Sequence, residues 1–178
     1  MDLRTWPRLV AICLLAAPVS ATTYLVSPDG SGDFPTIQAA IDGAQDGDVI
    51  ELADGTFTGP GNRDVRWQGQ TLTLRSQSGD ASRCVIDCQG GPSYHFALDI
   101  HVAGDASVLA GITVTGGYTQ GYGALTLAYA SMSIRDCIFR GNRGLSGGAV
   151  TTDYFGDPVF LRCTFWENLA SSGGAFCI

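Results

Sequence analysis

Short stretches in which apolar and polar residues alternate recur along the second half of the chain at a nearly constant interval. Residues 137–142 match residues 163–168, and residues 146–150 match residues 172–176, both at an offset of 26. Cysteine, phenylalanine, asparagine and the string Ser-Gly-Gly-Ala coincide in the two copies. Alternation with a period of two indicates strands with one buried face, and self-similarity at this interval predicts a solenoid of stacked units.

The same register extends backwards at offsets of 25 and 26 residues and predicts two columns of interior side chains. The first column is expected to contain Ile86, Ile112, Cys137 and Cys163. The second column is expected to contain Cys88, Val114, Phe139 and Phe165. Because side chains of one column should lie over one another, Cys137 and Cys163 are expected to form a buried ladder of thiols. A disulfide between them is the alternative, although its geometry is strained.

Each repeat contains a second apolar stretch, at residues 107–109, 132–134 and 159–161. Arg135 and Asp136 interrupt the alternation after the second of these stretches, which indicates a corner between two strands of one unit. The segments are rich in Val, Ile, Thr and Phe, and they lack both a helical period and the leucine-rich repeat pattern. These features predict an all-β fold, a right-handed parallel β-helix with rungs of about 25 residues.

Asn142 and Asn168 follow the second column by three residues and are expected at the next corner. Asparagine tolerates the left-handed backbone conformation that such a corner needs. Stacked asparagines also hydrogen-bond from one rung to the next, as amide ladders do in cross-β stacks. Both residues are therefore interpreted as structural.

A short helix is predicted near the start of the fold, because Ile37, Ala40, Ile41 and Ala44 share one helical face. Residues 49–52 are expected to form the first strand. The first rung of a β-helix exposes unpaired backbone and apolar side chains, so we expect the helix to cover it.

Residues 1–21 are predicted to be a signal peptide, because Arg4 and Arg8 precede an apolar run at residues 9–17 that ends in small residues. An uncut N-terminal anchor is the alternative. The run is shorter than the roughly 20 residues that span a bilayer. We therefore expect export, one β-helix domain over residues 22–178, and no transmembrane segment after the signal peptide.

Charge and cysteine content narrow the classes of partner. The chain has 17 acidic side chains against 10 basic ones, all of them arginine, and a net charge of −7. This balance argues against binding nucleic acid through general electrostatics. An odd number of cysteines follows the predicted signal peptide, and no Cys-x-x-Cys occurs. Since only His95 and His101 supply imidazole, neither a zinc site nor another metal site or cofactor is predicted.

Parts of the chain resemble known β-helix families. Residues 26–34 and 36–41 resemble the N-terminal cap of pectin methylesterases and of the wider pectin-lyase-like superfamily. The Phe-x-x-Asn strings at Phe139 and Phe165, each followed by Gly-Gly-Ala, resemble the repeats of polymorphic outer membrane proteins. The second resemblance implies a secreted protein or one at the bacterial cell surface or outer membrane. It also implies further rungs and an anchor, so the domain is expected to be truncated at Ile178.

The catalytic strings of those families are not found. A polygalacturonase-like hydrolase would need Asn-Thr-Asp, Asp-Asp and Gly-His-Gly strings, and the pectin methylesterase pattern breaks off after Phe57. A pectate lyase needs an acidic Ca²⁺ site opposite an arginine base. The candidates for that site are Arg135, Asp136, Asp153 and Arg162, and Ca²⁺ is expected only under this alternative.

Aromatic residues near the corners suggest a binding role instead. Tyr129 and Tyr154 occupy equivalent rung positions, and Tyr118, Tyr122 and Trp166 lie at or near corners. Of these aromatic residues, Tyr129, Tyr154 and Trp166 are the ligand-binding candidates. Such a row either stacks on sugar rings or packs on itself between rungs. Our leading hypothesis is a non-catalytic, adhesin-like module that presents an elongated face to polysaccharides or to cell-surface glycans and proteins. Two alternatives stay open: a lyase, hydrolase or pectinesterase acting on acidic glycans, and a structural fragment without a ligand.

Overall fold

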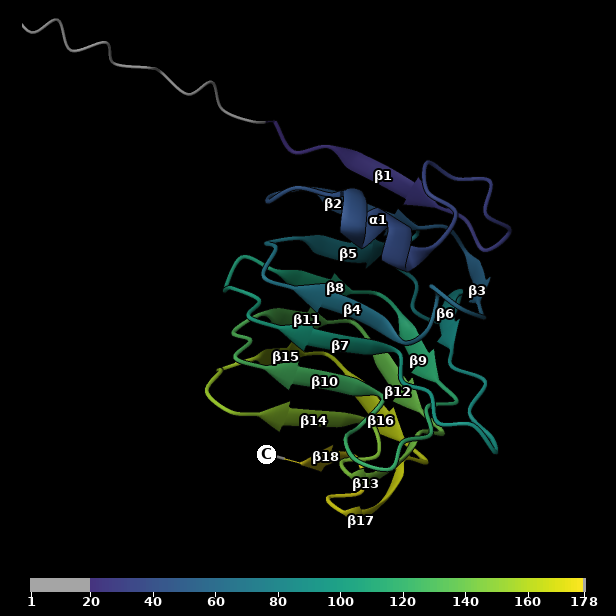
Figure 1. Cartoon of the computed structure of the whole chain (residues 1–178), viewed down its shortest axis with the longest axis vertical. Helices are drawn as coiled ribbons and strands as arrows, with labels where there is room; N and C mark the ends of the chain where they lie inside the picture. Colours follow the sequence, from purple (N-terminus) through teal and green to yellow (C-terminus); the bar gives the residue numbers. More distant parts are fainter. Residues whose placement is uncertain (1–19, 178) are drawn as a thin grey trace, which may run out of the picture.

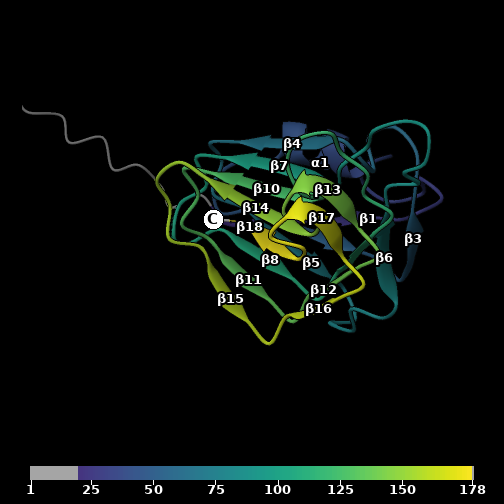
Figure 2. The same ribbon diagram turned by 90° about the horizontal axis from the view of Figure 1, so that it is seen from below.

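A computed structural model describes residues 20–177, which coil into one solenoid of stacked rungs (Figure 1). Every pair of neighbouring strands is parallel. Three sheets run along the long axis and enclose a single interior, and each full rung adds one strand to each sheet (Figure 2). The predicted β-helix is therefore confirmed. The predicted signal peptide, residues 1–21, lies almost entirely outside the described residues.

The first sheet has six strands in the order β1-β2-β5-β8-β11-β15. Its strands are β1 Thr23–Val26, β2 Val49–Leu52, β5 Thr73–Ser76, β8 Val108–Ala110, β11 Ser133–Arg135 and β15 Val159–Leu161. The structure corrects one prediction here, because β2 is not the first strand: β1 precedes it and pairs with it along its whole length. One isolated strand of four residues carries little periodic signal, which is why the sequence did not reveal it.

The other two sheets have five strands each. The second sheet consists of β3 Gly55–Phe57, β6 Cys84–Asp87, β9 Thr113–Thr115, β12 Ile138–Arg140 and β16 Thr164–Trp166. The third sheet consists of β4 Val65–Gln68, β7 Leu98–His101, β10 Leu125–Ala128, β14 Val150–Asp153 and β18 Phe176–Cys177. A short additional pair joins β13 Arg143–Ser146 to β17 Leu169–Ser172 at the corner between these two sheets.

An interior column of apolar side chains runs through the second sheet. Backbone pairing places Phe139 between Val114 and Phe165, as predicted. The two phenylalanine rings are parallel within 6° and their centroids lie 5.1 Å apart. Toward the N-terminus, Val114 pairs with Ile86, and Ile86 pairs in turn with Phe57. Large apolar side chains thus lie over one another through five rungs.

The predicted columns are wrong at one step, between β6 and β9. Val114 pairs with Ile86 and not with Cys88, so the predicted register is displaced by two residues there. Cys84 accordingly takes the position beneath Ile112 that was predicted for Ile86. The cause is loop length: the interval of 25 or 26 residues holds from β9 onward, whereas β5 and β8 pair at an offset of 35.

The predicted asparagine ladder is present. The Asn142 side-chain amide donates to the carbonyl oxygen of Val114 at 3.1 Å and to the amide oxygen of Asn168 at 3.0 Å. The left-handed backbone position is wrong by one residue, however, because it is occupied by Gly141 (φ 62°) and Glu167 (φ 53°), which precede the two asparagines. The asparagines stabilise the corner through their side chains, which bond to the backbone of the preceding rung.

A helix covers the start of the coil, as predicted. Helix α1 (Ile37–Gly43) buries Ile37 and Ile41 against the core. The Gln38 side-chain amide accepts a hydrogen bond from the backbone N–H of Arg66 at 2.7 Å and donates one to its carbonyl oxygen at 3.0 Å. Gln38 thereby satisfies the open edge of β4 as a neighbouring strand would, which explains how a helix of about two turns ends the third sheet.

All five cysteines of the described residues are free thiols. Burial raises the pKa of Cys84 and of Cys88 to about 12. Cys137 and Cys163 lie in successive rungs, as the predicted ladder requires, and a hydrogen bond from the Cys137 thiol lowers the pKa of Cys163 to about 7. The structure therefore contains the thiol ladder and not the strained disulfide.

The helical content of residues 20–177 is one segment of seven residues. No helix in that part of the chain reaches the length and apolarity needed to cross a bilayer.

Candidate functional site

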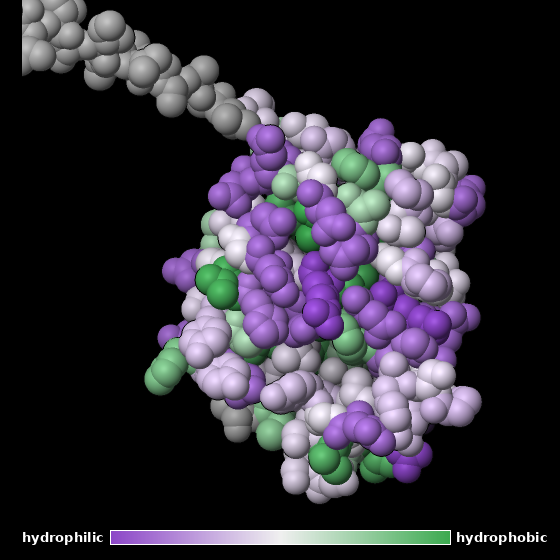
Figure 3. Space-filling model, in the orientation of Figure 1, coloured by the Kyte–Doolittle hydropathy of each residue, from purple (hydrophilic) through white to green (hydrophobic). Residues whose placement is uncertain are grey.

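The outer face of the third sheet carries a groove of about 410 Å³. It lies over β7, β10 and β14, on the face turned toward the viewer in Figure 3, where hydrophilic side chains gather over the upper strands. Its size falls within the range of small-molecule sites, about 300–1,000 Å³. Carboxylate, imidazole, hydroxyl and aromatic groups all face the same hollow.

The floor of the groove is the outward side of β10. The leucines of this strand are buried in the core, whereas Thr126 and Ala128 line the groove, although they are only 8% and 2% exposed. Ala128 lies in register between His101 of β7 and Asp153 of β14. Because adjacent strands are about 4.8 Å apart, the backbones of the two walls are about 9.6 Å apart. Small floor residues between longer polar walls keep the groove open.

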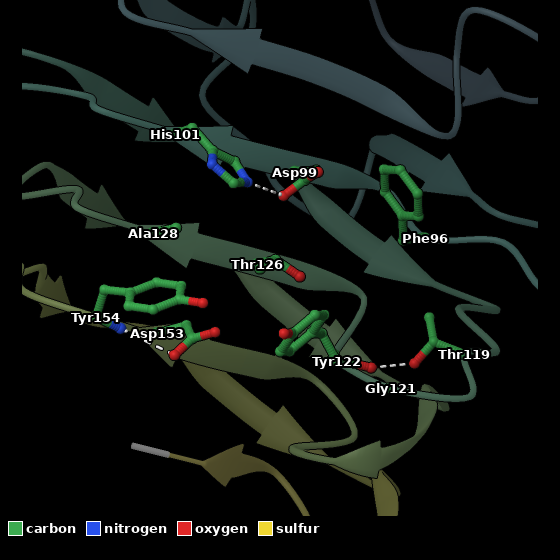
Figure 4. Close-up of a pocket in the computed structure, with 11 residues that line it drawn as sticks. Phe96, Asp99, His101, Thr119, Gly121, Tyr122, Thr126, Ala128, Asp153 and Tyr154 are labelled. Carbon is green, nitrogen blue, oxygen red and sulfur yellow. Dashed lines mark hydrogen bonds and ion pairs between the residues drawn. The ribbon is translucent and has the colours of Figure 1, made fainter.

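One wall consists of Asp99 and His101, which project outward from β7 between buried neighbours. The imidazole Nε2 of His101 lies 2.9 Å from the Asp99 carboxylate Oδ1, as Figure 4 shows. The side chains remain 40% and 25% exposed, respectively. Since a carboxylate accepts several hydrogen bonds, Asp99 can bond to a ligand while it holds the imidazole.

The opposite wall is formed by Asp153 at the end of β14 and by the loop that carries Tyr122. The loop is anchored at both ends: the Thr119 hydroxyl donates to the Tyr122 carbonyl, and the Gly123 N–H donates to the Thr151 hydroxyl oxygen at 2.8 Å. The negative charge of Asp153 raises the pKa of the Tyr122 phenol above its ordinary value. The phenol therefore stays protonated and can donate a hydrogen bond.

The predicted aromatic row packs on itself. The rings of Tyr129 and Tyr154 are parallel within 3°, with centroids 5.0 Å apart. Tyr154 also lines the groove, so Tyr129 holds a groove residue in place without lining the groove itself. Trp166 lies on β16 in the second sheet, in register with Arg140 and apart from this groove. Of the three predicted ligand-binding residues, the structure places only Tyr154 in the groove.

The structure does not bring the four lyase candidates together. Asp136 and Arg162 form a two-pronged ion pair of 2.6 and 2.8 Å at the corner between the first and second sheets. Arg162 lowers the pKa of Asp136, and Arg135 is exposed on β11. Asp153 lies on the third sheet, in the groove. An arginine base facing a Ca²⁺-binding acidic cluster is therefore not formed by these residues.

Sequence reasoning missed Asp99 and His101, and it placed Tyr122 near a corner without predicting its position over the third sheet. The available signal was the string Leu-Asp-Ile-His at residues 98–101, an apolar and polar alternation that marks a strand with a polar outer face. The irregular loop length of this rung separated it from the repeat. The position of Tyr122 over the sheet depends on loop anchoring between rungs, which the sequence does not reveal.

Among residues 20–177, no three His, Cys, Asp or Glu side chains lie close enough to hold a metal ion. We therefore treat the acidic groups of the groove as hydrogen-bond acceptors. Comparisons with protein-family models, with curated proteins and with solved structures find no match to this chain.

Proposed function

We propose that this protein is an exported β-helix module that binds a neutral saccharide in the groove of the third sheet without transforming it. The observation that carries the proposal is the exposed Tyr122 ring beside two carboxylates, those of Asp99 and Asp153, over a floor of small side chains. Figure 4 shows these groups directed toward the same space.

The chemistry of the groove matches that of a sugar ring, which has an apolar C–H face and a rim of hydroxyls. Tyr122 is 51% exposed, and no other ring among residues 20–177 packs on it, so its face is open to a ligand. The carboxylates of Asp99 and Asp153 accept hydrogen bonds from hydroxyls, and charge-assisted bonds of this kind are the stronger ones.

The charge of the groove favours neutral sugars over uronates. Two carboxylates face the hollow, and none of its lining residues is arginine. A ligand carboxylate would meet like charge, which disfavours binding. Our enzyme alternative, which requires acidic glycans, therefore receives no support from this site.

Titration calorimetry with neutral oligosaccharides of glucose, mannose and xylose, and with oligogalacturonate, tests the proposal. Tyr122→Ala should weaken binding of the best neutral ligand by about two- to tenfold, because an aromatic contact contributes about 0.5–1.5 kcal/mol. The matched control is Phe155→Ala, which removes an 86% exposed ring that does not line the groove. Equal loss in both variants, or oligogalacturonate binding that is tighter than that of the neutral sugars and is lost in Tyr122→Ala, would refute the proposal.

The same samples test whether binding occurs without turnover. Incubation of each oligosaccharide with the protein, with and without Ca²⁺, should leave its chain length and saturation unchanged. Appearance of unsaturated or shortened products that disappears in Asp153→Asn would establish an enzyme instead.

Export and superfamily membership are part of the same proposal. The composition of the first 21 residues supports export, and the cap helix over parallel rungs agrees with the resemblance to pectin-lyase-like proteins. Sequencing the N-terminus of protein recovered outside the producing cell should give a start near Thr22. Recovery of an intact leader on cell-retained protein would argue for the anchored alternative.

A further inference from the structure

A second hollow, of about 440 Å³, lies on the other side of the loop that carries Tyr122. Thr119 lines both the groove and this hollow, so the loop forms the partition between them. The groups that face the second hollow differ in kind: two tyrosines, one glutamine and one arginine, with no carboxylate.

The backbone around this hollow is held from three rungs. Tyr118 exchanges backbone hydrogen bonds with His95, at 2.8 and 2.9 Å. Arg143 donates its N–H to the Gly117 carbonyl at 2.7 Å and accepts from the Thr119 N–H at 2.9 Å. The aromatic and cationic side chains are thereby mounted on a hydrogen-bonded frame, which limits the entropy lost on binding.

The aromatic wall of the hollow consists of Tyr94 and Tyr118, whose ring centroids lie 5.1 Å apart at an angle of 31°. The Gln120 side-chain amide donates to the Tyr94 hydroxyl. Tyr94 remains 48% exposed, so part of its ring is available to a ligand. A glycine at position 90 is required here, because a Cβ would lie 2.7 Å from that of Tyr118.

Arg143 is the cationic group of the hollow. Its guanidinium carbon lies 5.9 Å from the centre of the Tyr118 ring. Four other arginines each lie within 4.0 Å of a carboxylate: Arg63, Arg75, Arg83 and Arg162. Arg143 has no such partner among residues 20–177, which is also true of Arg66, Arg135 and Arg140, but of these four only Arg143 lines a hollow together with tyrosines. Its planar fork of N–H donors matches a carboxylate or a sulfate.

We propose that this hollow is a second binding site, which takes a sugar unit bearing an oxyanion. The carboxylate or sulfate binds the Arg143 guanidinium, and the sugar ring lies against the exposed part of Tyr94. The site is separate from the neutral groove and does not depend on it. The oxyanion chemistry is common to uronates and sulfated sugars, and the test below distinguishes the two.

Titration calorimetry with four probes measures the requirement for charge: cellobiouronic acid, its methyl ester, cellobiose 6-sulfate and inorganic sulfate. The ester keeps the shape of the acid and removes its charge. We expect the acid, the sulfated sugar or both to bind about tenfold or more tightly than the ester, because a hydrogen bond to a charged group is worth about 1.5–3 kcal/mol. If the uronic acid binds more tightly than the sulfated sugar, the ligand class is a uronate; if the sulfated sugar binds more tightly, it is a sulfated sugar.

Two charge-removing variants locate the site. Arg143→Gln should abolish the preference for the charged probe over the ester, whereas Arg140→Gln, which removes an exposed arginine outside the hollow, should preserve it. Arg143→Lys keeps the charge but loses the planar fork, so an intermediate preference is expected. If Arg143→Gln does not fold, Arg143→Lys is used in its place.

Three results would overturn the inference. The first is equal binding of the ester and both charged sugars, or no binding of any of them. The second is equal loss of preference in the two glutamine variants, which would indicate general electrostatics. The third is inorganic sulfate binding as tightly as the sugars, which would exclude a contribution from the tyrosine. The Tyr122→Ala variant should keep the charge preference, so failure of the groove proposal is seen separately.

Discussion

The interior of the coil and the outer face of the third sheet are built from the same strands but follow different rules. Inside, each side chain contacts the one above and the one below, so a column stays apolar through all of its rungs, as Phe57, Ile86 and Val114 do. Outside, the row His101, Ala128, Asp153 changes chemistry at every step. Packing constrains the first set, and only solvent and ligand constrain the second.

This comparison separates stability from binding. Changes in the interior columns should lower the free energy of unfolding and leave the affinity of the folded fraction unchanged. Changes in the groove should lower the affinity for the ligand and have their main effect there, not on the free energy of unfolding. The interior variants below are expected to lower the free energy of unfolding only, and an interior variant that also changed the affinity of the folded fraction would break the distinction.

The largest effect is expected from Phe139→Ala. Phe139 is fully buried and stacks on Phe165, so its loss should destabilise the fold by about 3–5 kcal/mol. Urea unfolding followed by circular dichroism measures this. Phe165→Ala, at a half-buried position of the same column, should cost less. If Phe139→Ala lowered the free energy of unfolding by less than about 1 kcal/mol, the phenylalanine column would not be a main source of stability.

A smaller loss of stability, about 2–3 kcal/mol, is expected from Asn142→Ala. The change removes the acceptor of the Gly117 N–H and the donor to the Val114 carbonyl, both of which are buried. The same unfolding experiment measures it, with Asn168→Ala as the comparison at a more exposed corner. An Asn142→Ala variant as stable as the parent would show that water replaces the ladder at no cost.

On the outer face, Ala128→Leu should fill the floor of the groove. The larger side chain projects between His101 and Asp153 and takes the space of a ligand, so neutral saccharide affinity should fall at least about tenfold, or 1.4 kcal/mol. Because Ala128 is only 2% exposed, overpacking is also expected to lower the free energy of unfolding, by up to about 1–3 kcal/mol, so the affinity is compared in the folded fraction. Undiminished affinity in a folded variant would place the ligand elsewhere.

The smallest expected effect is on the reactivity of the cysteine thiols as the pH is raised. Because the pKa of Cys163 is lowered to about 7, its alkylation by iodoacetamide should rise with pH up to about 7 and then level off. Burial raises the pKa of Cys84 and Cys88 to about 12, so both should stay unmodified in native protein at pH 9. Mass spectrometry of peptides reports each site, and early modification of Cys84 would show that the interior opens.

The later rungs could be predicted from sequence because their loops have equal length. The pairing of Phe139 with Phe165 and the ladder from Asn142 to Asn168 follow from one offset of 26 residues. The register before Val114 could not be predicted, because loops of unequal length displace Ile86 by two positions. A fixed offset identifies a column only where no insertion interrupts it.

The candidate site was less accessible to sequence reasoning. Tyr154 was predicted because it repeats Tyr129, and the structure does place it in the groove. Asp99 and His101 belong to a rung of different length and carry no repeat signal. Asp136 and Arg162 are 26 residues apart, so the repeat places them in neighbouring rungs, but the sequence analysis grouped them as parts of a lyase site and did not predict the ion pair.

A crystal structure of the protein with the tightest-binding neutral oligosaccharide tests the central claim most directly. We predict a sugar ring over β10, in contact with Tyr122 and with hydroxyls within hydrogen-bonding distance of Asp99 or Asp153. A saccharide bound on another face, with this groove filled only by solvent, would contradict the account.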